Sequence, residues 1–184
     1  MDKGDGVLSY ITEKEYYEKT EQTELGHWRK SKKRWKYHQQ AIDMIKTLAI
    51  TNSKKVLEVG TAGIQIVSGS ETMDLPNTKW DYSTNSPTFN YDMRQIPWPI
   101  KEDHYELLIA LRVFQHLAPL QKECLYEALR VAKHVLLAIP ETYNTKKGKG
   151  VTNEEMINWI KPTKCSLVIQ PSAMKGTTLF LCKK

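Results

Sequence analysis

The stretch YELLIALRVFQHLAPLQKECLYEALRVAKHVLLAI, residues 105–139, decides the fold class of this 184-residue chain. Its two ends, residues 105–111 and 135–139, are short apolar runs typical of strands that are buried on both faces. Between them, residues 119–133 place apolar side chains at helical spacing along one face: Leu120, Cys124, Ala128 and Val131. A buried strand, a helix and another buried strand predict one unit of a mostly parallel sheet.

Further strand patterns lie on both sides of this unit. Residues 56–59, 71–75 and 89–91 precede it, and residues 165–169 and 177–182 follow it. The last two runs are joined by a short turn and predict a C-terminal antiparallel hairpin. Because strands alternate with helices, we expect an α/β fold. It would be a three-layer, doubly wound, mostly parallel Rossmann-like sheet that ends in this hairpin.

Helices are also expected outside the central unit. Residues 31–50 carry apolar side chains at helical spacing, and residues 10–24 show a weaker pattern of the same kind. Thr152 has the side chain of an N-cap and predicts a short helix after it. The segment NTKKGKG, residues 144–150, is expected to be a flexible loop.

The composition of the whole chain bounds the class of protein. Its length, with 40% hydrophobic and 26% charged residues, predicts a single globular domain over residues 1–184, with residues 1–50 as an N-terminal helical cap. The three cysteines, Cys124, Cys165 and Cys182, are far apart and odd in number, which favours free thiols over disulfides or a zinc site. No apolar run approaches the roughly 18 residues of a membrane span. We therefore expect a cytoplasmic protein without membrane contact or bound metal.

The positive charge of the chain is concentrated near its N-terminus. The net charge is +6, and residues 27–55 hold nine basic residues and one acidic residue. Aromatic and basic side chains alternate within this segment: Trp28, Arg29, Lys32, Lys33, Trp35 and His38. Such a mixture is typical either of a helix packed on the domain as a lid or of a surface that stacks on nucleic acid. Packing is the preferred interpretation, and nucleic-acid binding is the second.

The first strand ends in a turn that has features of a ligand site. Ligands of open α/β sheets bind at the carboxyl ends of the strands, and this strand runs into Glu58-Val59-Gly60-Thr61-Ala62-Gly63. Glycine at such a turn lets the backbone approach a ligand. The carboxylate of Glu58, in an otherwise apolar strand, needs a partner. A cationic ligand or a backbone amide of the next turn would satisfy it.

Carboxylates also follow the second and third strands. Asp74 is well placed to accept hydrogen bonds from two ribose hydroxyls, or else it is a turn-forming residue before Pro76. Asp92 is well placed to accept a hydrogen bond from an adenine amino group, or else it is an ordinary loop residue. The residues alone leave both alternatives open.

Three segments resemble, in order, the motifs of the class I S-adenosylmethionine (SAM)-dependent methyltransferases. They are VLEVGTAG at residues 56–63, YDMRQIPWPIKEDHYELLIALRVFQHL at residues 91–117 and LYEALRVAKHVLLAIPE at residues 125–141. The resemblance covers the chain from about residue 55 to residue 141. It implies SAM as the cofactor and methyl transfer to a small-molecule or glycan-like acceptor that the sequence does not name.

The resemblance also assigns roles to residues. It implies cofactor contacts for eight of them: Glu58, Gly60, Thr61, Gly63, Asp74, Asp92, Met93 and Leu111. It implies acceptor contacts for Arg112 and His116, which follow the fourth strand, and it identifies no catalytic base.

One departure from the family pattern bears on function. Only 14 positions separate Gly60 from Asp74, where the family accommodates a full helix, so we expect a short or irregular first crossover. The alternative function is therefore a non-catalytic binding domain of the same fold, which would contact RNA through its basic N-terminal segment.

Overall fold

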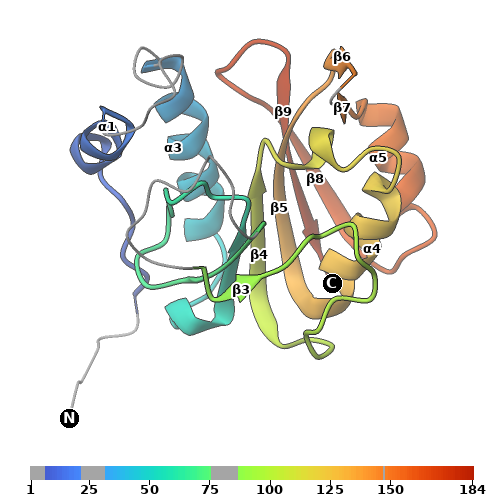
Figure 1. Ribbon diagram of the computed structural model, residues 1–184, viewed down its shortest axis with the longest axis horizontal. Coiled ribbons are helices and arrows are strands. Elements are labelled where there is room, and N and C mark those ends of the chain that lie inside the picture. The colour runs from blue at the N-terminus through green and yellow to red at the C-terminus, as the bar shows by residue number, and fades with distance from the viewer. Residues whose placement is uncertain (1–6, 22–31, 76–86, 147) are drawn as a thin grey trace.

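Seven strands form one sheet in the order β3-β2-β1-β4-β5-β9-β8 (Figure 1). The computed structural model describes residues 7–21, 32–75, 87–146 and 148–184. The strands of this sheet are β1 (Val56–Val59), β2 (Glu71–Asp74), β3 (Phe89–Asn90), β4 (Tyr105–Leu111), β5 (Ala132–Pro140), β8 (Ser166–Pro171) and β9 (Thr177–Lys183).

The strand directions are those of a doubly wound sheet. Neighbouring strands from β3 to β5 pair in parallel, and β9 runs antiparallel between β5 and β8. All four residues of β1 are buried, as are nearly all of β5, which is why continuous apolar runs build these strands. The predicted α/β fold, with its mostly parallel sheet and its C-terminal hairpin of β8 and β9, is confirmed.

Helices cover both faces of the sheet (Figure 1). They are α1 (Glu13–Glu21) and α3 (Lys32–Lys46) on one face, and α4 (Gln121–Val131) and α5 (Asn153–Ile160) on the other. Successive strand residues point to opposite faces, so Leu136 packs with α3 while Leu137 packs with α4. Each face therefore has its own buried apolar core.

The helix ends follow local hydrogen bonding. Thr152 and Glu155 form a capping box at the start of α5, which confirms the expected N-cap. Helix α3 ends at Lys46, short of the expected residue 50. The reason is that the Thr47 hydroxyl donates to the Met44 carbonyl, and the Leu48 amide bonds three residues back to Ile45, which tightens and closes the last turn.

The segment expected to be a flexible loop, residues 144–150, is partly ordered. Strands β6 (Asn144–Thr145) and β7 (Gly148–Lys149) pair as a small antiparallel hairpin, so the expectation of a loop was wrong there. Glycine permits this because a Cβ atom on Gly148 would collide with the Gln115 carbonyl. The hairpin is therefore held against the segment that follows β4.

The crossover from β1 to β2 contains no helix. Residues 60–70 all belong to the described part of the chain, and they form turns and a single bridge. The N-terminal segment fills the space: the Ile11 amide donates to the Ile66 carbonyl at 3.1 Å, and the Ser68 amide donates to the Ser9 carbonyl at 2.8 Å. The expected irregular crossover is confirmed, and its missing helix is replaced by an extended segment from the chain start.

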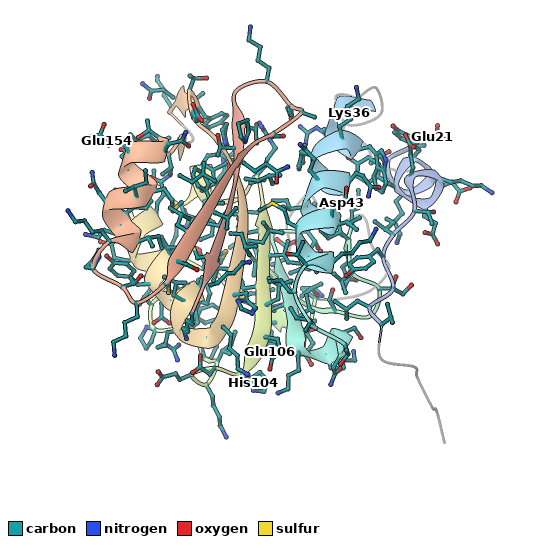
Figure 2. All side chains as sticks on the ribbon, turned by 180° about the vertical axis from the view of Figure 1, so that it is seen from behind. Glu21, Lys36, Asp43, His104, Glu106 and Glu154 are labelled. Atoms are coloured by element: carbon teal, nitrogen blue, oxygen red, sulfur yellow. The ribbon has the colours of Figure 1, made fainter. Side chains whose placement is uncertain are left out.

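Several charged side chains mark the outside of this architecture (Figure 2). Lys36 and Asp43 lie on the outer side of α3, and Glu154 lies at the start of α5; all three are exposed. His104 and Glu106 mark the opposite end of the molecule, where β4 begins. Within the described ranges, no helix is long and apolar enough to cross a membrane.

Candidate functional site

The predicted site residues follow four strands that are neighbours in the sheet. Strands β3, β2, β1 and β4 lie side by side and run in parallel, so the segments after them meet at the carboxyl edge. Ligands of open α/β sheets bind at this edge, near the point where the strand order reverses. Here the order reverses between β1 and β4.

Glu58 is satisfied by the protein itself. Its side chain is 3% exposed and accepts hydrogen bonds from the amides of Ile66 and Val67, both at 2.8 Å, and from the Ser70 hydroxyl at 2.8 Å. Burial raises the pKa of Glu58 to about 7, although these three hydrogen bonds act in the opposite direction. A cationic ligand or a backbone amide of the next turn was expected to satisfy Glu58, and the structure shows the backbone amides. The carboxylate thereby holds the helix-free crossover against β1.

The turn after β1 has a left-handed backbone. The φ angles are +62° at Gly60, +50° at Ala62 and +82° at Gly63. A Cβ atom on Gly60 would lie 2.5 Å from a methyl group of Val113, so glycine is needed where the ends of β1 and β4 approach each other. The Thr61 hydroxyl accepts a hydrogen bond from the Gly63 amide at 3.2 Å and closes the turn.

Asp74 joins the end of β2 to this turn. Its carboxylate accepts a hydrogen bond from the Ala62 amide at 3.1 Å and one from the Leu75 amide at 3.0 Å. The structure therefore brings Asp74 together with the glycine turn, as expected for residues that share a ligand.

Asp92 and Met93 are engaged in their own loop. The Asp92 carboxylate accepts from the Arg94 guanidinium at 2.7 Å and 3.0 Å and from the Arg94 amide at 3.0 Å, and these bonds lower its pKa. The buried Met93 offers its carbonyl to the indole of Trp98 at 2.8 Å and to the thiol of Cys124 at 3.3 Å. The loop is thus fixed on the core, but the carboxylate has a cation of its own.

Arg112 and His116 have different surroundings, although both follow β4. The Arg112 guanidinium donates to the Thr177 hydroxyl at 2.8 Å and lies 3.7 Å from the Met174 sulfur, beside the start of β9. The exposed His116 ring meets the Tyr143 ring edge-on, with 5.6 Å between centroids. These contacts direct Arg112 toward β9, and they direct His116 toward Tyr143, just before the β6–β7 hairpin.

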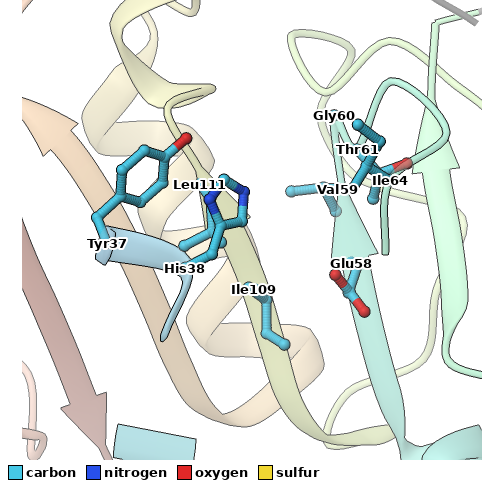
Figure 3. A pocket seen from close by; sticks show the side chains of 9 residues that line it. All are labelled: Tyr37, His38, Glu58, Val59, Gly60, Thr61, Ile64, Ile109 and Leu111. Atoms are coloured by element: carbon cyan, nitrogen blue, oxygen red, sulfur yellow. The ribbon is translucent and has the colours of Figure 1, made fainter. Parts of the chain in front are cut away.

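A small pocket lies between α3 and the ends of β1 and β4 (Figure 3). Its volume is about 20 Å³, and its lining comprises Tyr37, His38, Glu58, Val59, Gly60, Thr61, Ile64, Ile109 and Leu111. That volume holds about one water molecule. The predicted residues Glu58, Gly60, Thr61 and Leu111 are thus brought together around one cavity.

Two lining residues, Tyr37 and His38, were not predicted as site residues. Figure 3 shows both projecting from α3 toward the end of β4. Burial lowers the pKa of His38 to about 4, and its Nδ1 atom lies 2.8 Å from the Arg34 carbonyl. Helical spacing places Tyr37 on the apolar face of α3, but the sequence carries no signal that this face covers the turn after β1.

Comparison with known proteins gives one consistent result. No protein-family model matches the chain, and no curated protein matches it. Among solved structures, a SAM-dependent methyltransferase from Aquifex aeolicus gives a TM-score of 0.55 at 15% identity, over 77% of this chain and 88% of that one. A SAM-dependent methyltransferase from Thermotoga maritima gives a TM-score of 0.58 at 11% identity, over 83% of this chain and 91% of that one. The chain has the fold of the SAM-dependent methyltransferases.

A third structure with the methyltransferase fold was solved with SAM bound. It is the magnesium protoporphyrin IX methyltransferase from Synechocystis, which gives a TM-score of 0.53 at 12% identity, over 82% of this chain and 81% of that one. At these identities the likeness concerns the fold alone. What the present chain binds has to be argued from its own residues.

Proposed function

We propose that the chain binds SAM at the carboxyl edge of β1, β2 and β3 and transfers its methyl group to a small-molecule or glycan-like acceptor. The observation that carries this proposal is the hydrogen bond from the Ala62 amide to Asp74. It joins a carboxylate at the end of the second strand to a glycine turn at the end of the first, an arrangement suited to ribose hydroxyls.

The other predicted residues have consistent roles in this proposal. Gly60, Thr61 and Gly63 would lie along the methionine half of the cofactor, and Asp92 and Met93 would lie along the adenine. SAM supplies a methyl group that its sulfonium already activates. The protein then has to bind the cofactor, align the acceptor and exclude water, and alignment alone supplies a large part of the rate.

The pocket sets a condition on binding. A ligand the size of SAM needs a site of several hundred Å³, whereas the pocket beside Gly60 and Thr61 has a volume of about 20 Å³. Asp74 and Asp92 would serve the adenosine half of the cofactor, whereas Tyr37 and His38 line the space beside Gly60 and Thr61, where the methionine half would lie. We therefore expect these two side chains to move when the methionine half binds.

The small volume of the pocket also favours a second candidate function. A domain whose pocket is small, and whose Asp92 is paired with Arg94, is also suited to a binding role without catalysis. Trp28, Arg29 and Lys30, which belong to the segment proposed to contact RNA, lie outside the described residues.

Titration calorimetry of the full chain with SAM and with its demethylated product tests the proposal. We expect binding in the micromolar range, which corresponds to about −8 kcal/mol. Asp74→Asn should weaken it about three- to tenfold, because an anionic acceptor of hydrogen bonds is lost. Asp103→Asn, at the opposite edge of the sheet, is the matched control and should bind like the wild type. No heat at millimolar ligand would exclude methyl transfer, and binding without turnover would favour the second function.

We also propose that residues 1–184 act as one domain with residues 1–50 as its cap, and that the protein works in the cytoplasm. The support for the first is the packing of α1 and α3 on the sheet. The support for the second is that Cys124, Cys165 and Cys182 are all free thiols.

A further inference from the structure

Arg112 is a partly buried cation whose contacts include no carboxylate. Its guanidinium contacts the Thr177 hydroxyl and the Met174 sulfur, and it forms no ion pair within the described part of the chain. By contrast, Arg94 pairs with Asp92 and Arg130 pairs with Glu127. A cation withdrawn from water without a counter-ion is costly to maintain, so its position calls for an anion.

A second guanidinium contributes to the same surroundings. Burial raises the pKa of Tyr37, and the positive charges of Arg112 and Arg34 both oppose this rise. Burial lowers the pKa of Arg112. The nearby Tyr37 and Tyr143 raise this pKa, and the charge of Arg34 lowers it. The positive charges of Arg34 on α3 and of Arg112 after β4 thus both act on the phenol of Tyr37.

The carboxylate of Glu141, which contacts the start of β9, belongs to the other face of the sheet. Glu141 accepts a hydrogen bond from Thr178, whereas Arg112 donates to the adjacent Thr177. Because side chains alternate along a strand, Thr177 shares its face with Leu179, which packs in the core under α3. Glu141 is thus directed away from the guanidinium.

The direction of the Arg112 guanidinium separates it from the residues proposed for the cofactor. Most of those residues lie at or after the ends of β1, β2 and β3, and Leu111, the last residue of β4, lines the pocket beside Gly60 and Thr61. The Arg112 side chain, by contrast, reaches in the opposite direction along the carboxyl edge, toward β5 and β9. We propose that the Arg112 guanidinium, together with the hydroxyl of Thr177, binds the carboxylate or phosphate of an acidic methyl acceptor. This inference rests on the proposed function and adds the chemical class of the acceptor.

Inorganic phosphate and benzoate are suitable probes, because each presents one oxyanion without the rest of an acceptor. They are titrated by calorimetry into the full chain saturated with the demethylated product of SAM. We expect millimolar binding that Arg112→Gln weakens about tenfold, the effect of losing a charge-assisted hydrogen bond. Lys133→Gln removes the same charge at the opposite edge of the sheet and should bind both probes like the wild type.

Two further measurements keep the outcome decisive. Arg112 has a φ of +63°, so Arg112→Asn, which tolerates this conformation, serves as a second variant if the glutamine variant unfolds. SAM affinity is measured for every variant and should change less than twofold. Unchanged anion binding in both variants would overturn the inference, and so would loss of SAM affinity, since the guanidinium would then serve the cofactor. If the wild type binds phosphate through Arg112 but binds no SAM, the anion site stands and the methyl-transfer function falls.

Discussion

Two buried residues of the pocket, Glu58 and His38, respond to pH in opposite directions. The pKa of Glu58 is raised to about 7, so the folded protein holds its proton more tightly than the unfolded chain. Its contribution to stability is complete at low pH and is lost as pH rises toward 7. The pKa of His38 is lowered to about 4, so its contribution is present above the ordinary histidine pKa and is lost as pH falls toward 4.

At this scale we expect a nearly flat stability profile in the wild type between about pH 4.5 and 6.5, because the two contributions cancel there. In His38→Gln the free energy of unfolding should fall as pH rises through this range, because only the Glu58 contribution remains. In Glu58→Gln it should rise with pH, and each slope should reach up to about 1.4 kcal/mol per pH unit. Denaturant unfolding at several pH values measures both slopes. Slopes of the same sign in the two variants would show that burial does not control these groups.

At the scale of elements, the contact between the ends of β1 and β4 depends on Gly60. Gly60→Ala combines a left-handed φ with a collision against Val113, so we expect a loss of more than about 2 kcal/mol of unfolding free energy. Gly69→Ala is the matched control: its φ is +76°, but the nearest atom to a new Cβ is Ser53 Oγ at 3.3 Å. It should cost only about 1 kcal/mol. Val113→Ala in the Gly60→Ala background should recover part of the difference, and no recovery would disprove the collision.

The crossover after β1 is also held by the extended N-terminal segment. Ile11 is buried beneath it, whereas Val7 is 81% exposed. Ile11→Ala should therefore cost about 2–4 kcal/mol of unfolding free energy, and Val7→Ala should cost nearly nothing. Thermal and denaturant unfolding of the two variants check this difference. Equal stabilities would mean that the segment does not support the crossover.

The elements differ in how far the sequence predicts them. Strands such as β4 and β5 are apparent because a strand buried on both faces needs a continuous apolar run, and α5 is apparent from its cap at Thr152. The short distance from Gly60 to Asp74 excludes a full helix there. It does not show that residues 8–11 fill the gap, because that pairing joins segments far apart in the chain, with no local pattern to mark it.

At the scale of the whole molecule, the candidate site is a joint product of the sheet edge and α3. The sequence predicts a carboxyl edge with Glu58, Asp74 and Arg112 at or after strand ends, because it predicts the strands themselves, but it does not give their order. The position of Tyr37 and His38 beside the turn depends on how α3 crosses the sheet, and a single sequence does not encode that crossing in any local signal. Packing of this segment as a lid was the preferred interpretation, but the turn that it would cover was not predicted.

Because Tyr37 and His38 line the small pocket beside Gly60 and Thr61, we expect SAM to bind a minor conformation in which the first half of α3 has moved. The apparent affinity is then reduced by the fraction of molecules that are open, and a variant that opens the pocket should bind faster. His38→Ala removes a ring that packs at a tilt against Tyr37 and Tyr16, with centroid distances of 4.3 Å and 4.8 Å. We therefore expect a higher association rate for SAM and a lower melting temperature. Stopped-flow binding measures the rate.

Hydrogen exchange should show that SAM changes amide protection in residues 34–40 and leaves α4 unaffected. Ile45→Ala, a core change farther along α3, should lower the melting temperature without raising the rate. If SAM binds the wild type and His38→Ala at the same rate, with no change of protection in α3, then α3 does not gate the site.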